Sequence, residues 1–368
     1  MKKKNAFLWV AGSLLMSLAF VSCSDDDDNN NPLPPTPEQP ATEGVYILNS
    51  GKMNSNNATL DYYDIKSETL KQKIFSTVNG RGLGDTANDM LVYGSKLYVT
   101  VDVSNTIEVM DLEANSLKTI SPKDEAGQPQ SPRNLAAYQG KVYVTLFDGH
   151  LAEIDTTSME ITRKVKVGPS PYQVCPLNGK LYVANSGGFN LVQDSTLSVV
   201  DAASFKEEKK IVVGLNPQTV CADKSGELYV MCGGNFADIK ASVQRVNLEK
   251  GTSESILTND NILMAAGADD QLLIINSEND PNWKPINTKF TKFDMAADQK
   301  VSDNFISDGT AVERPYSLSL DPVKGYIFIG TSDYVNTGDA FIFTSEGKLM
   351  TKLAVSGINP IAIRSIAQ

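Results

Sequence analysis

This 368-residue chain shows no recognisable cluster of the residues that carry out acid–base or nucleophilic catalysis. It has one histidine, His150, so a histidine-rich zinc site or a Ser/His/Asp or Cys/His mechanism would have to use that position. We interpret His150, at the start of an expected strand, as structural. The sequence contains no paired carboxylates at a recognisable spacing, no G-x-S-x-G motif and no glycine-rich phosphate loop. It therefore indicates a binding protein that is not an enzyme and requires no cofactor.

Carboxylates recur along the chain, and two roles for them have to be weighed. Asp102, Asp148 and Asp333 lie near the ends of expected second strands and are candidates for calcium binding, but no EF-hand-like spacing supports a calcium site, so we expect no metal. A second set ends the expected third strands: Asp64, Asp111, Asp155, Asp201 and Asp294, with Asn247 in the fifth copy. We expect this second set to accept hydrogen bonds from the amides of its own turns.

Residues suited to ligand binding gather in the segments expected to join second and third strands. These segments, 49–58, 185–195, 232–241 and 276–288, differ from one another and are rich in Asn, Gly and aromatic residues. Together with the entries to the inner strands they contain the candidate ligand-binding residues Arg81, Arg133, Phe147, Tyr172, Phe189, Asn190, Gln218, Asn235, Phe236, Asn276, Trp283, Arg314, Tyr316 and Tyr334. Such a set suits a large, polar, neutral molecule with amides and a flat apolar part. The alternative is that these are solvated loops without a ligand.

A repeated unit decides the expected fold. It contains a short apolar strand, a Gly turn and then the sequence K-L-Y-V or a variant of it. The Y-V step occurs at Tyr46-Ile47, Tyr98-Val99, Tyr143-Val144, Tyr182-Val183, Tyr229-Val230, Leu273-Ile274 and Phe328-Ile329. The repeat length of about 46 residues is that of a four-stranded propeller blade. We predict an all-β fold over residues 44–368: a seven-bladed β-propeller with four-stranded antiparallel blades.

The two ends of the repeat region predict how the ring closes. The first copy begins at a second strand and lacks an inner strand, whereas the segment 359–366 matches inner strands such as 216–220. An open ring would leave an unpaired strand edge and an exposed apolar face. We therefore expect the C-terminal strand to complete the first blade.

The cysteines of this region are expected to be free. Cys175, Cys221 and Cys232 fall on strands, and their odd number leaves at least one without a partner. Cys175 and Cys221 occupy the same place in adjacent copies, so a bridge between them is the alternative to small buried thiols.

The N-terminal region predicts export and lipidation. Residues 1–22 combine three lysines with an apolar run, as in a bacterial signal peptide, and Cys23 is the expected lipid-bearing residue. A plain signal peptide cleaved nearby is the alternative. The acidic stretch 24–29 resembles the export tag of outer-membrane lipoproteins in Bacteroides-like bacteria, the alternative being a solvated acidic linker. The Pro- and Asn-rich remainder to residue 43 is expected to be a semi-rigid tether. We expect a lipid-anchored outer-membrane protein that faces the extracellular side.

The repeated sequences L-Y-V, V-V-D and V-G-x-x-P, together with the lipoprotein signal at the N-terminus, resemble those of the YncE-like propellers and, among them, the BtuG surface lipoproteins of gut Bacteroides. The resemblance implies capture of cobalamin or a related corrinoid at the mouth of the propeller channel, without chemical turnover. It also implies delivery to a BtuB-like TonB-dependent transporter of the outer membrane. The alternatives are a surface propeller for adhesion or for binding glycans or other small ligands and, more remotely, a calcium-dependent lactonase-like enzyme. Nucleic acid is not expected as a partner, because the formal net charge is −11 at pH 7.

Overall fold

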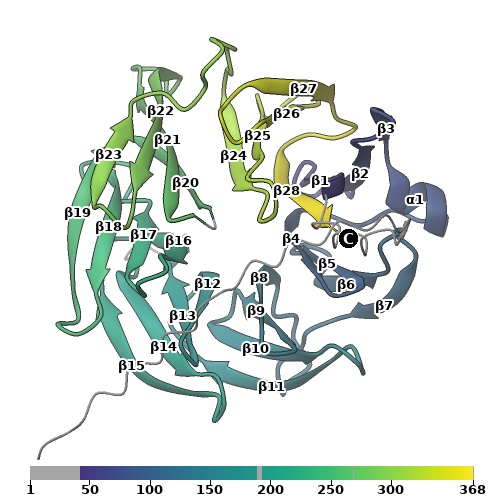
Figure 1. Ribbon diagram of the computed structural model, residues 1–368. Helices are drawn as coiled ribbons and strands as arrows, with labels where there is room; N and C mark the ends of the chain where they lie inside the picture. The colour runs from purple at the N-terminus through teal and green to yellow at the C-terminus, as the bar shows by residue number, and fades with distance from the viewer. Residues whose placement is uncertain (1–41, 189–192, 268, 368) are drawn as a thin grey trace, which may run out of the picture. The chain divides into compact units, whose positions relative to one another are not determined.

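The computed structural model describes residues 42–188, 193–267 and 269–367. These residues belong to one compact unit, Pro40–Gln368, which contains seven four-stranded antiparallel sheets set around an axis (Figure 1). The predicted all-β, seven-bladed propeller is thereby confirmed. The expected signal peptide, Cys23 and nearly all of the tether lie outside the described residues, and the first strand begins at Thr42, two residues before the expected boundary.

The blades follow one another along the chain, and each has an inner strand at the axis and an outer strand at the rim. From the axis outwards, blade 1 contains β28 (Pro360–Ala367), β1 (Thr42–Asn49), β2 (Thr59–Asp64) and β3 (Thr69–Lys71). In the same order, blade 2 contains β4 (Ala87–Tyr93), β5 (Lys96–Val101), β6 (Thr106–Met110) and β7 (Ser116–Ile120). Blade 3 contains β8 (Pro132–Tyr138), β9 (Lys141–Leu146), β10 (His150–Asp155) and β11 (Glu160–Lys166). Blade 4 contains β12 (Pro171–Leu177), β13 (Lys180–Asn185), β14 (Thr196–Asp201) and β15 (Lys206–Val212).

The remaining blades have the same order of strands. Blade 5 contains β16 (Pro217–Ala222), β17 (Leu228–Cys232), β18 (Ala241–Asn247) and β19 (Thr252–Asn259). Blade 6 contains β20 (Asn261–Ala266), β21 (Gln271–Asn279), β22 (Pro285–Asp294) and β23 (Gln299–Ser302). Blade 7 contains β24 (Pro315–Leu320), β25 (Ile327–Thr331), β26 (Asp339–Phe343) and β27 (Leu349–Ala354). One short helix, α1 (Ile74–Asn79), joins blades 1 and 2, and no helix among the described residues is long and apolar enough to cross a membrane.

The hydrophobic core lies between neighbouring blades. Second strands such as β5 and β9 are buried at nearly every position because both of their faces are covered, whereas the outer strand β11 alternates between exposed and half-buried positions. The large residue of each Y-V step packs against the next blade. Tyr46 of blade 1 donates a hydrogen bond from Oη to the carbonyl of Leu112 in blade 2 at 2.9 Å, and Tyr229 of blade 5 does the same to Met295 in blade 6 at 3.1 Å. In blade 6 this position is occupied by Leu273.

Ring closure follows the predicted scheme. β28 pairs antiparallel with β1, from Thr42 opposite Ala367 to Asn49 opposite Pro360. The Asp321 carboxylate of blade 7 holds both strands at one end of this pair, accepting hydrogen bonds from Thr42 Oγ1 at 2.7 Å and Ser365 Oγ at 2.6 Å. The first and last strands are therefore fixed to each other and to the neighbouring blade.

The carboxylates at the ends of the third strands have the expected structural role. Asp155 accepts hydrogen bonds from the backbone amides of Thr157 and Ser158, and Asp201 accepts one from Ser204. The same pattern recurs at Asp64, Asp111, Asn247 and Asp294. These side chains close the outer hairpins of the blades.

The three described cysteines are free, as expected. Cys175 and Cys232 are buried, and burial raises the pKa of each thiol to about 12. Cys221 is half-buried by surface area, and desolvation again raises the pKa of its thiol. The thiols therefore pack as small apolar groups within the sheets.

Candidate ligand-binding site

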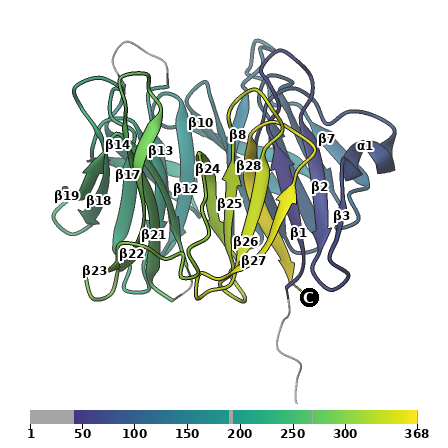
Figure 2. The same ribbon diagram turned by 90° about the horizontal axis from the view of Figure 1, so that it is seen from above.

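The loops between second and third strands and the entries to the inner strands emerge on one end of the propeller, which we call the mouth face. The opposite end carries the start of β1 and the end of β28 (Figure 2). The residue before the inner strand has a positive φ in six blades: Thr86, Ser131, Ser170, Asn216, Arg314 and Asn359. The carbonyl of each of these residues accepts a hydrogen bond from the amide that follows the second strand of the same blade, at 2.7–3.3 Å. In blade 6 the Asp260 carboxylate takes this role and accepts from the Asn279 amide. These hydrogen bonds between the entry of the inner strand and the end of the second strand fix the base of each mouth loop.

Arg133 lies at the entry of β8 and is the most enclosed cation of the mouth face. Its side chain is only 10% exposed, and its guanidinium carbon lies 4.4 Å from the ring centre of Tyr172 and 5.1 Å from that of Phe147. The Asp102 carboxylate is 4.0 Å away. Among the described residues, no hydrogen-bond partner faces Arg133 Nε. The two rings and the nearby carboxylate hold this guanidinium in place at the channel mouth.

Tyr316, at the entry of β24, extends the aromatic surface of the channel mouth into blade 7. Its ring packs edge-on against Tyr334, with the ring centres 5.6 Å apart. Burial raises the pKa of Tyr316, with smaller contributions from the neighbouring hydroxyls of Tyr334 and Tyr172. Arg314 lies beside this pair, and its guanidinium is 3.9 Å from the Asp333 carboxylate.

Three aromatic side chains stand out from the mouth loops of blades 5, 6 and 7; we call Phe236, Trp283 and Tyr334 the aromatic strip. They are 63%, 67% and 66% exposed. Phe236 and Trp283 line one cavity of about 340 Å³, and Trp283 and Tyr334 line a second of about 220 Å³, so the strip is continuous. Exposed aromatic rings that border cavities suit a ligand with a broad apolar face.

The backbone of the strip is held in an uncommon conformation. Phe236, Trp283 and Tyr334 have φ values of 58°, 61° and 65°. Such left-handed conformations cost bulky residues about 1–2 kcal/mol each. In each loop a polar side chain just before the aromatic residue accepts two backbone amide hydrogen bonds and stabilises the turn: Asn235 in blade 5, Asp280 in blade 6 and Asp333 in blade 7.

The structure places two other candidate residues outside the exposed lining of the mouth. Asn276 is 4% exposed within β21, where it bonds Asn259 and Thr291, because β21 and β22 extend through most of the segment expected to be a loop. Arg81 lies over the outer strands of blade 2, paired with Glu108 at 2.7 Å. Asn276 is therefore a buried strand residue rather than a loop residue, and the expectation that Arg81 lies at the channel mouth was wrong.

The remaining candidate residues lie as follows. Gln218 is at the entry of β16 and donates a hydrogen bond to Asn216 at 3.2 Å. Asn235 is at the mouth, but its amide bonds its own loop and Asp238. Phe189 and Asn190 lie outside the described residues.

The candidate calcium ligands are separate from one another. Asp148 accepts from Gln130 at 2.6 Å and contacts His150 Nδ1 at 3.0 Å, Asp102 lies beside Arg133, and Asp333 binds its own loop. Over the ranges that the structure describes, no group of three or more His, Cys, Asp or Glu side chains is placed to hold a metal ion.

Comparison with known proteins gives a partial family match and a fold match. Residues 43–170 match the family model described as "Domain of unknown function (DUF5074)". No curated protein matches the chain. Among solved structures, Kuenenia stuttgartiensis hydrazine synthase is similar to it with a TM-score of 0.58 and 14% sequence identity, covering 75% of this chain and 93% of that one. At this identity the similarity concerns the fold alone.

Proposed function

We propose that this protein is a cell-surface lipoprotein that captures cobalamin or a related corrinoid at the mouth face and delivers it to a TonB-dependent transporter of the outer membrane. The observation that carries the proposal is the aromatic strip, with Trp283 bordering a cavity on each side. No covalent step is involved.

The chemistry of a corrinoid complements the side chains of the mouth face. Its broad ring offers apolar faces to Trp283 and its neighbours, and its peripheral amides offer donors and acceptors to the polar groups of the flanking cavities, such as Lys240 and Asn279. Cobalamin also carries a phosphate in its nucleotide loop. The enclosed guanidinium of Arg133 offers charge-assisted hydrogen bonds to such a group.

The surface location rests on the sequence, with Cys23 as the expected lipid site. The compact unit starts and ends at the face opposite the mouth (Figure 2), which supports an anchored protein whose mouth face is free to meet ligand and transporter. The transporter partner rests on the resemblance to BtuG proteins.

The first test is calorimetric titration of the chain from Ser24 onward with cyanocobalamin and its ring precursor cobinamide. We expect one-to-one binding and a red colour that stays with the protein. Trp283 is the only tryptophan of this form, so the change in its fluorescence locates the ligand, with absorbance corrected for the ligand's own bands. Absence of both heat and retained colour contradicts the proposal.

Substitution at Trp283 then tests the site itself. Trp283→Ala is expected to weaken binding about tenfold, because stacking on one aromatic ring is worth roughly 1–1.5 kcal/mol. Trp283→Phe, which keeps a ring, should lose less. The matched control is Val212→Ala, since Val212 is equally exposed at 64% but lies on the outer strand β15. Equal affinity of Trp283→Ala and the parent protein would remove the strip from the binding site.

Glycan binding at the same strip is the second candidate function, because exposed aromatic rings also stack on sugar rings. A glycan panel titrated under the same conditions separates the two functions.

A further inference from the structure

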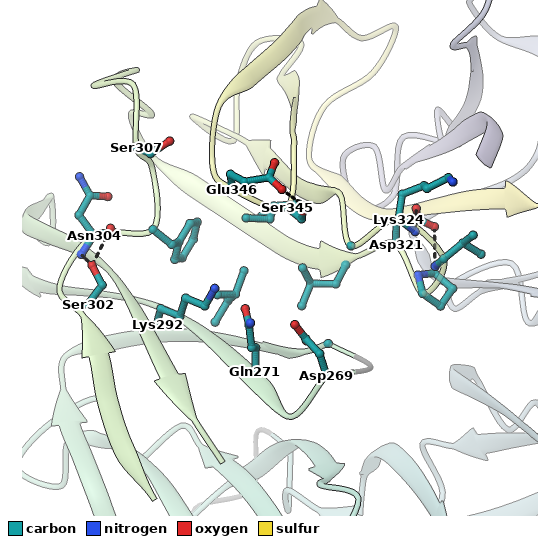
Figure 3. Close-up of a pocket in the computed structure, with 18 residues that line it drawn as sticks. Asp269, Gln271, Lys292, Ser302, Asn304, Ser307, Asp321, Lys324, Ser345 and Glu346 are labelled. Atoms are coloured by element: carbon teal, nitrogen blue, oxygen red, sulfur yellow. Dashed lines mark hydrogen bonds between the residues drawn. The ribbon is translucent and has the colours of Figure 1, made fainter. Parts of the chain in front are cut away.

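A large cavity lies between blades 6 and 7, at the end opposite the mouth face. Its volume is about 610 Å³, within the range of pockets that hold small ligands. Its walls come from the turn before β21, from β22, from the segment after β23, and from the β24–β25 and β26–β27 turns (Figure 3). None of these residues belongs to the proposed corrinoid site.

A departure from the repeat explains why a cavity forms here. Leu273 occupies the position that holds Tyr in five blades and Phe328 in blade 7, so the ring that fills the space toward the next blade is missing. Ser345, on the opposite wall, corresponds in the repeat to Leu112 and Met295, whose carbonyls accept the tyrosine hydroxyls elsewhere. The space is therefore specific to this pair of blades.

The cavity combines an apolar base with charges of both signs. Leu273, Phe305 and Ile327 are buried residues of its base. Lys292 and Asp269 are directed into it from blade 6, and Glu346 lies on the wall formed by blade 7 (Figure 3).

These three charged side chains are not in ion pairs, unlike some lysines and acids of the outer hairpins. Within the described ranges, no ion pair links Lys292, Asp269 or Glu346 to another side chain, whereas Lys141 pairs with Asp155 and Lys180 with Asp201. Glu346 Oε1 accepts a hydrogen bond from Ser345 Oγ at 2.8 Å. A cavity with an ammonium group and two carboxylates that are not in ion pairs complements a ligand that itself carries both charges.

We propose that this cavity is a second binding site, independent of the mouth face, for a short peptide with free termini and an apolar side chain. Lys292 receives the peptide carboxylate, Asp269 and Glu346 receive its ammonium group, and the apolar side chain packs on Leu273 and Phe305.

The test is calorimetric titration of the chain from Ser24 onward with the tripeptide Leu-Gly-Gly, beside the same tripeptide acetylated and amidated at its ends. We expect heat only from the form with free termini. Lys292→Gln should weaken binding about tenfold, the effect of one charge-assisted hydrogen bond worth about 1.4 kcal/mol. Leu273→Tyr should abolish binding by filling the cavity, and Leu273→Ile is the control that leaves the cavity open.

Thermal melting of Leu273→Tyr separates loss of the site from loss of the fold, and we expect a midpoint equal to or above that of the parent. The same variant should titrate cyanocobalamin as the parent does, so failure of either proposal is seen separately. Absence of heat from Leu-Gly-Gly, equal heat from the blocked tripeptide, or binding that survives Leu273→Tyr would each overturn the proposal.

Discussion

Ring closure through β28 can be tested with one buried side chain. Ile363 lies on β28, is 1% exposed, and belongs to a core cluster with Val45 of blade 1 and Phe328 and Ile342 of blade 7. Replacing it by alanine removes apolar contacts on both sides of the closure and leaves a cavity. Buried Ile→Ala changes cost about 2–5 kcal/mol of unfolding free energy, and we expect about 3 kcal/mol at this position.

The assay is thermal unfolding followed by circular dichroism. For a unit of this length, the unfolding entropy makes 1 kcal/mol equivalent to about 1.5 °C, so the midpoint should fall by about 4 °C. Val212→Ala, at an exposed position, should change the free energy by less than about 0.5 kcal/mol. Deleting residues 359–368 removes the whole β28–β1 pairing and should abolish cooperative unfolding.

Two results would refute this account of closure. One is an Ile363→Ala midpoint within about 1 °C of the parent, which would mean that the contacts of β28 contribute little to stability. The other is a truncated chain that unfolds at the same temperature and with the same cooperativity as the intact one.

Three further predictions concern the mouth loops and the thiols. Phe236→Ala should weaken corrinoid binding less than Trp283→Ala in the same titration, because only Trp283 borders both cavities; the opposite order would contradict this. Hydrogen bonds from Asn336 and Val335 lower the pKa of Asp333 to about 2, so the stabilisation of its loop is complete above about pH 4 and is lost as the pH falls toward 2. Ligand affinity measured over this window should fall with the pH, and less so in Asp333→Asn. Cys175 and Cys232, with pKa values raised to about 12, should resist a thiol reagent at about pH 8 until the protein unfolds; rapid labelling of the folded protein would contradict this.

The fold could be predicted from the sequence because its signals are local and repeated. Each Y-V step marks a second strand, and Asp155 or Asp201 marks the hairpin that follows a third strand. Closure could be predicted because an inner-strand pattern at the C-terminus complements a missing inner strand at Thr42.

The site could be predicted only in part, because loop length depends on how far two strands stay paired. Asn276 was expected in a loop, but pairing of Glu278 with Ile286 extends the β21–β22 hairpin and buries it. Arg81 was expected at the channel mouth, but Glu108, distant in sequence, binds it over blade 2.

The cavity beside Leu273 was missed for a different reason. The sequence does mark this cavity, because Leu273 is the one aliphatic residue at a position that is aromatic in the other Y-V steps. Leucine is nevertheless apolar, so the strand pattern is unchanged. What differs is side-chain volume, which hydrophobic periodicity does not register.

The position of β1 has a mechanical consequence for a chain that is held from its N-terminal side. Tension transmitted through Thr42 would pull β1 along its own length, while β28 and β2 pair with it on its two sides. Under this shear load, the hydrogen bonds between β1 and its two neighbours have to break together rather than one at a time. A force applied from the N-terminal side would therefore act on a strand that is paired on both sides, and unfolding would have to break both ladders at once.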